Sequence, residues 1–153
     1  MQTVDYIVII SRWVHIIAAV AAVGGAVFQR YALFPAMADA LDADEHLRLR
    51  EAVRQRWARF VHACIALLLL TGGLNFYLLA LAPKVKPMPY HALFGIKFLA
   101  AMAVFFLAAA LAGRSMGFEK YRQDSRHWLG VVVILAVLIV LLSGVLYGIR
   151  TAG

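Results

Sequence analysis

The sequence predicts an all-α fold: an integral membrane four-helix up-down bundle in which residues 1–153 form a single domain. Of the 153 residues, 64% are hydrophobic and only 15% are charged, and the mean hydropathy is +0.83. Soluble domains are typically about 45–50% apolar and about 25% charged. The composition therefore argues against a soluble enzyme, a nucleic-acid-binding module and a disordered chain.

Four apolar stretches are long enough to cross a bilayer, for which a helix needs about 20 residues. The first contains Arg12 and His15, the third contains Lys97, and the fourth contains no charged residue. We expect all four to be retained as spans in the folded protein. They cover residues of about 6–34, 58–82, 89–112 and 127–149.

Three segments connect these spans. The segment from about residue 39 to residue 57 carries mixed charges. Within it, Asp42 followed by Asp44 and Glu45 is typical of the start of a helix. We therefore predict a helical loop that runs directly into the second span. Residues 113–126 form a second basic loop, and residues 83–88 form a short turn.

The distribution of positive charge predicts the orientation. Most arginine and lysine residues lie in the two longer loops, whereas the termini and the 83–88 turn carry few. Cytoplasmic loops of membrane proteins are enriched in such residues. We therefore expect both termini on the non-cytoplasmic side, in a bacterial inner membrane. The net charge of +7 is then explained without nucleic acid as a partner. Cys64 is the only cysteine, so no internal disulfide can form.

Four of the five histidines lie near the start of a different span. The exception, His46, is expected to be solvated in a loop. Because successive spans alternate in direction, His15 and His91 approach one membrane depth, and His62 and His127 approach the other. Alternate helices of an up-down bundle are diagonal, so each pair can face across the core.

Two facing histidines can supply both axial ligands of a haem iron. We therefore expect haem b, with two haems rather than one per chain, ligated by His15/His91 and His62/His127. The expected function is electron transfer by a membrane b-type cytochrome. Quinol, superoxide or a partner protein would be the electron donor, and the lipid bilayer surrounds the protein. For each histidine, a position at the headgroup level without any ligand is the alternative.

Glycines and arginines accompany these histidines. Arg12-Trp-Val-His15 and Arg59-Phe-Val-His62 form a short internal repeat. A glycine one turn away on the same face would let a flat macrocycle approach the backbone, although small residues also serve helix packing. The arginines would bind haem propionates or, alternatively, extend to lipid phosphate. The candidate cofactor-binding residues besides the histidines are Gly25, Gly72, Gly95, Gly130, Arg12, Arg59 and Arg126.

Lys97 lies six residues past His91, which is deep in the membrane for a charged side chain. Such residues usually have a function, so Lys97 is a candidate catalytic residue, a propionate partner or part of a proton site. Asn75 and Gln29 are weaker polar candidates. The aromatic residues near the span ends fit an interfacial belt.

The run from Arg12 through Val20, followed by Gly24-Gly25 and Pro35, resembles the first helix of the copper-resistance D-like and HemJ-like membrane families. The run from His91 through Lys97 to Leu99 is similar to their lysine-containing third helix. This resemblance implies a four-helix membrane protein that binds haem b and oxidises protoporphyrinogen. It also implies a haem-ligand role for His15 and a site role for Lys97. The four-histidine pattern itself looks more like di-haem membrane cytochromes b.

Three alternatives to electron transfer remain. One is an enzyme that oxidises a porphyrinogen with one haem and Lys97 in its site. Another is copper handling by histidine together with methionine thioethers. The third is a haem-free structural subunit of a larger complex. Under each of these hypotheses the protein can form a homo-oligomer. The methionines considered for copper are Met37, Met88, Met102 and Met116.

Overall fold

The computed structural model describes residues 3–80, 88–113 and 116–151. The described residues are almost entirely helical, and they contain no strand. The elements are α1 (Thr3–Phe28), η1 (Gln29–Leu33), α2 (Phe34–Ala40), α3 (Ala43–Ala80), α4 (Met88–Ala112), η2 (Met116–Phe118), α5 (Glu119–Gln123) and α6 (Ser125–Thr151).

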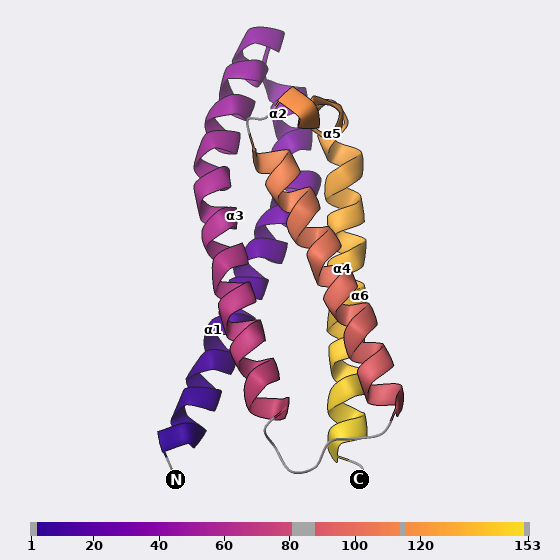
Figure 1. Cartoon of the computed structure of the whole chain (residues 1–153). Coiled ribbons are helices and arrows are strands. Elements are labelled where there is room, and N and C mark those ends of the chain that lie inside the picture. Colours follow the sequence, from indigo (N-terminus) through magenta and orange to yellow (C-terminus); the bar gives the residue numbers. More distant parts are fainter. Residues whose placement is uncertain (1–2, 81–87, 114–115, 152–153) are drawn as a thin grey trace.

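The four long helices α1, α3, α4 and α6 form an up-down bundle (Figure 1). α1 packs mainly against α3, and α4 packs mainly against α6, whereas α1 with α4 and α3 with α6 are the diagonal pairs. The N- and C-terminal ends of the chain lie at the same end of the bundle, which we call the terminal end. The opposite end carries α2, α5 and the start of α3, and we call it the loop end.

Four helical segments are long and apolar enough to cross a membrane. Large hydrophobic side chains such as Leu70, Leu99, Ile134 and Val140 are exposed on the outside of the bundle. In water such a surface would drive aggregation, whereas lipid tails cover it without penalty. The prediction of an integral membrane protein is confirmed at this level. The segments are Tyr6–Ala40, Ala43–Leu78, Ala92–Ala112 and Ser125–Gly148.

The first span continues into a π-helical turn at the loop end. Phe34 donates its N–H to the carbonyl of Gln29, five residues earlier. Pro35 follows at once and has no N–H to continue the regular helical pattern. The proline and the widened turn allow the chain to proceed into α2, which ends at Ala40.

The expected helical loop is the N-terminal part of α3, which runs without a break into the second span. The backbone N–H of Glu45 donates to Asp42 Oδ1 at 2.9 Å. Asp42 therefore caps the helix, as its position in the sequence predicts.

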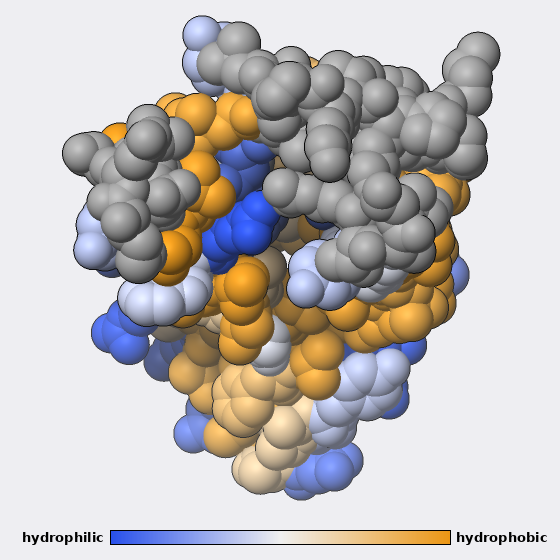
Figure 2. Space-filling model, turned by 90° about the horizontal axis from the view of Figure 1, so that it is seen from below, coloured by the Kyte–Doolittle hydropathy of each residue, from blue (hydrophilic) through white to orange (hydrophobic). Residues whose placement is uncertain are grey.

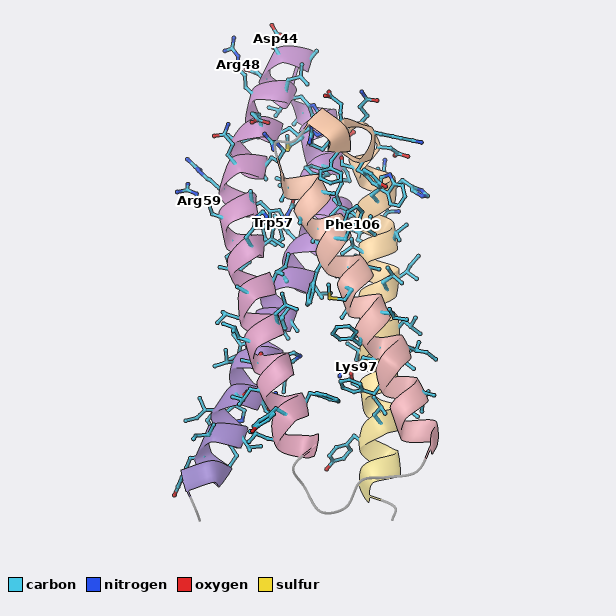
Figure 3. The ribbon with its side chains drawn as sticks, in the orientation of Figure 1. Asp44, Arg48, Trp57, Arg59, Lys97 and Phe106 are labelled. Atoms are coloured by element: carbon cyan, nitrogen blue, oxygen red, sulfur yellow. The ribbon has the colours of Figure 1, made fainter. Side chains whose placement is uncertain are left out.

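The apolar core lies in the half of the bundle nearer the loop end, which we call the loop half. Ala26, Leu107, Leu129 and Val132 form a buried cluster, and Phe34 is among the partly buried side chains that pack against it. Gly25 of α1 accommodates the indole of Trp57 from α3, because a Cβ at Gly25 would lie 2.1 Å from the indole Cη2. Figure 3 shows Trp57 pointing from α3 towards the other helices. This half is therefore closely packed.

Candidate functional site in the terminal half

A polar contact joins α1 to α3 in the half of the bundle nearer the terminal end, the terminal half. His15 Nδ1 lies 2.8 Å from Thr71 Oγ1. Ser11, one turn before His15, is buried, and its hydroxyl is directed at the carbonyl of Thr71 at 3.5 Å. His15 itself is half-buried rather than exposed to lipid. The structure therefore turns this histidine towards the neighbouring helix.

The hydroxyl of Thr71 determines which nitrogen of His15 carries the proton. Thr71 Oγ1 donates its single hydrogen to the carbonyl of Leu67 at 2.6 Å, so it can only accept from His15. His15 must then donate its Nδ1–H, which leaves the lone pair of the neutral imidazole on Nε2. Among the described residues, no hydrogen bond engages Nε2. This tautomer is suited to bind a metal through Nε2, with Thr71 as the supporting partner.

Lys97 and Asn75 add polar groups to the same part of the bundle. Figure 3 places Lys97 on the side of α4 that faces the other helices. Asn75 lies one turn beyond Thr71 on the same face of α3, and its Oδ1 is buried without a hydrogen-bond partner among the described residues. From the terminal end, hydrophilic side chains are visible inside a hollow between apolar flanks (Figure 2).

We call His15, Thr71, Gly72, Asn75 and Lys97 the His15 cluster. A Cβ at Gly72 would lie 3.4 Å from His15 Cε1, so Gly72 is the part of α3 next to the imidazole. The rings of Phe76 and Phe94 stack with their centroids 4.7 Å apart, and they join α3 to α4. The His15 cluster combines a lysine with an imidazole whose Nε2 has no hydrogen-bond partner among the described residues.

The predicted partner of His15 is in α4, but the side chain of His91 is outside the described part of the structure. Gly95 is four residues further along, and a Cβ there would meet no atom within 4 Å. Space is therefore available next to Gly95. The His15/His91 pair remains a prediction.

The pair expected at the other membrane depth is not formed. The side chains of His62 and His127 are both exposed, which corrects the prediction that they face each other across the core. His62 Nδ1 donates to the carbonyl of Ala58 in its own helix at 2.5 Å. His127 contacts the neighbouring ring of Trp128 edge-on, with centroids 5.6 Å apart. These imidazoles do not fit an interior haem.

Two of the glycines expected beside a macrocycle accommodate side chains of this chain instead. Trp57 occupies the space at Gly25, as described above. The guanidinium of Arg30 occupies the space at Gly130, where a Cβ would lie 2.8 Å from Arg30 Cζ. Both positions therefore serve helix packing, which was the alternative interpretation, because a large side chain of a neighbouring helix needs the missing Cβ.

The arginines expected to bind propionates lie on the outside of the bundle. Arg12, Arg59 and Arg126 are exposed, and Figure 3 shows Arg59 pointing away from the other helices. This position suits contact with lipid phosphate. Arg12 is one turn from His15 in the direction of the terminal end, so it remains a candidate propionate partner. His46 is only partly exposed in α3.

Sequence reasoning did not select Ser11 or Thr71, and it rated Asn75 only as a weak candidate. A signal for them exists in the spacing: Ser11 and His15 are four residues apart, and so are Thr71 and Asn75. Residues at this spacing share a helix face. Two polar pairs in two neighbouring spans therefore indicate faces that turn towards each other.

Within the described ranges, no three His, Cys, Asp or Glu side chains converge to hold a metal ion. A haem needs fewer protein ligands, since the macrocycle supplies four of its own nitrogens. Of the methionines considered for copper, Met37 is buried in α2 and Met102 is exposed in α4, and the side chains of Met88 and Met116 lie outside the described part. No protein-family model, curated protein or solved structure matches this chain.

Proposed function

We propose that this chain is a membrane b-type haem protein that transfers electrons through one haem in the terminal half. His15 would be one axial ligand through Nε2, and His91 is the predicted second ligand. The observation that supports this most is the hydrogen bond from His15 Nδ1 to Thr71, since it leaves the ligating lone pair on Nε2. A bound haem supplies an iron that takes up and releases one electron.

The residues of the chain have separate roles in this proposal. Thr71 holds the imidazole in one tautomer and one orientation, as a second partner does for most ligating histidines. Lys97 provides positive charge inside the bundle, where it can pair with a propionate carboxylate. Phe76 and Phe94, which stack on each other, join α3 to α4. Low solvent access and a nearby cation both shift the reduction potential of an iron centre.

A single site restricts the route that electrons can take. His15 lies nine residues into the first span from Tyr6, or about 14 Å along the helix at 1.5 Å per residue. The hydrocarbon core is about 30 Å thick, so His15 lies near mid-depth, and one haem alone does not bridge the membrane from the terminal side to the loop side. We place the terminal side outside the cytoplasm of a bacterial inner membrane, because the basic residues gather at the loop end. Quinol, superoxide or a partner protein remains the proposed donor.

One observation favours a second candidate function. Lys97 is only partly exposed and lies on the side of α4 that faces the other helices, which suits an enzyme that oxidises a porphyrinogen beside one haem. Lys97 would then bind a substrate carboxylate. One variant separates the functions. Lys97→Ala would abolish porphyrinogen oxidation by an enzyme that still retains its haem, whereas a pure electron carrier with this substitution would continue to accept electrons from quinol.

The test is a pyridine haemochrome assay on the purified protein, which reports haem type and number per chain. One haem b per chain is expected, reducible by a quinol. Two haems per chain would contradict the single-site proposal, and protein reconstituted with haemin that shows no Soret band would contradict haem binding altogether.

A further inference from the structure

A second site candidate lies at the loop end, in a cavity of about 510 Å³ between the start of α3 and the α5–α6 segment. Three arginines from these elements line it, together with two glutamates and several apolar side chains. The cavity is far along the bundle from the His15 cluster, so an inference about it does not depend on haem. Its charged lining residues are Arg50, Glu51, Arg54, Glu119 and Arg122.

Two of the three arginines have acidic partners. Arg54 donates from Nε and Nη2 to the two carboxylate oxygens of Glu51, at 2.8 and 2.6 Å. Its Nη1 donates to the carbonyls of Ala112 and Gly113, which end α4. Arg122 Nη2 lies 3.7 Å from Glu119 Oε2. The charges of these pairs offset one another, and Arg54 also closes the C-terminus of α4.

Arg50 has no carboxylate partner among the described residues. Its Nη2 donates to the carbonyl of Arg122 at 2.8 Å and to the hydroxyl of Ser125 at 2.6 Å, and the guanidinium lies over the ring of Phe34. These contacts fix the planar group in one orientation. Its Nε and Nη1 donate to no acceptor in the described part of the chain, so one oriented positive charge in the cavity is not neutralised.

We propose that this cavity binds the phosphate of a molecule or headgroup whose net charge is negative, with Arg50 as its main ligand. The planar guanidinium matches the geometry of phosphate oxygens, and basic pockets at the cytoplasmic ends of membrane helices bind anionic headgroups. Phe34, Trp57 and Leu129 give the same cavity an apolar wall for the acyl chains of a lipid. The phosphate comes from an anionic phospholipid or from the aqueous phase, and the two sources are separable.

The experiment is native mass spectrometry of the full-length protein with phosphatidylglycerol or phosphatidylcholine added in equal amounts. We expect phosphatidylglycerol to be retained about tenfold more than phosphatidylcholine, and Arg50→Gln to abolish this preference. Arg48→Gln is the matched control, because Arg48 is exposed on the same helix and points away from the bundle (Figure 3). Equal retention of the two lipids, or an Arg50→Gln protein with the wild-type preference, would overturn the proposal.

A second variant tests the site if Arg50→Gln does not fold. Glu51→Gln removes the acid that neutralises Arg54 and should raise the retention of phosphatidylglycerol several-fold; unchanged or weaker retention would count against the site. Inorganic phosphate is the last probe. Displacement of phosphatidylglycerol by millimolar phosphate, in the wild type and in Arg48→Gln alike, would identify the phosphate group as the recognised chemistry and the aqueous phase as a competing source. Full retention of the lipid at that phosphate concentration would count against recognition of the phosphate.

Discussion

The two halves of the bundle differ in how they fill the space between the helices. In the loop half, Trp57 and Arg30 pack onto glycines, and an apolar cluster around Leu107 and Leu129 completes the core. In the terminal half, the interior contains a histidine, a lysine and an amide whose oxygen has no partner among the described residues. A membrane protein does not keep polar groups inside for stability, since they are costly there. The difference therefore directs the search for a redox site to the terminal half, whereas the charged groups of the loop half line the cavity at its end.

The same contrast appears in the repeated Arg-x-Val-His sequence. In α1 the helix is rotated so that His15 turns inward, where it meets Thr71. In α3 the rotation differs: Val61 is buried and His62 is exposed. Two copies of one short motif thus present different residues to the core, because contacts with the neighbouring helices decide the rotation of each span.

The largest expected effect on stability is in the closely packed loop half. Gly25→Ala places a methyl group where the Trp57 indole lies, so the indole must move. Overpacking of this kind costs about 1–3 kcal/mol. Thermal unfolding in detergent should show a clearly lower Tm than the wild type. Gly24→Ala is the control, since a Cβ at Gly24 would meet no atom within 4 Å, and equal Tm values for the two variants would refute the packing difference.

The next effect concerns cofactor affinity in the terminal half. Thr71→Val keeps the shape of the side chain but removes the acceptor of the His15 Nδ1–H. Loss of such a supporting partner typically weakens metal affinity about 10–100-fold, and the haem affinity measured by haemin titration should fall by at least about tenfold. Thr71→Ser retains the hydroxyl and should bind like the wild type. Unchanged affinity in Thr71→Val would exclude Thr71 from the site.

The smallest effect is expected at Gly72, the terminal-half counterpart of Gly25. A Cβ there would lie 3.4 Å from His15 Cε1, close to ordinary van der Waals contact. Gly72→Ala should therefore change the unfolding free energy by less than about 0.5 kcal/mol, with Gly73→Ala as the neighbouring control. A Tm loss as large as that of Gly25→Ala would show that the terminal half is packed as closely as the loop half.

Much of the architecture follows from the sequence. Lengths of apolar sequence predict the four spans, and Asp42 and Pro35 mark the change between the first and the second. The rotation of each helix does not follow in the same way. A membrane helix is apolar on nearly every face, so the sequence pattern does not distinguish the face that contacts lipid from the face that contacts the other helices. The prediction that His62 faces inward was wrong for this reason.

The candidate site was predicted in part. His15 and Lys97 are conspicuous because charged or ionisable residues are rare inside spans, and the structure turns both towards the neighbouring helices. Thr71 is not conspicuous, since a threonine can satisfy its hydroxyl within its own helix. Its role depends on His15 from another helix, and only the packing of α1 against α3 creates that contact.

The most direct test compares the two copies of the repeated motif. Soret absorbance per chain would be measured for purified His15→Ala and His62→Ala proteins at equal concentration after haemin reconstitution. His15→Ala should lose nearly all of the absorbance, while His62→Ala keeps the wild-type value. Equal losses in the two variants, or a loss confined to His62→Ala, would contradict the assignment of the redox site to the terminal half.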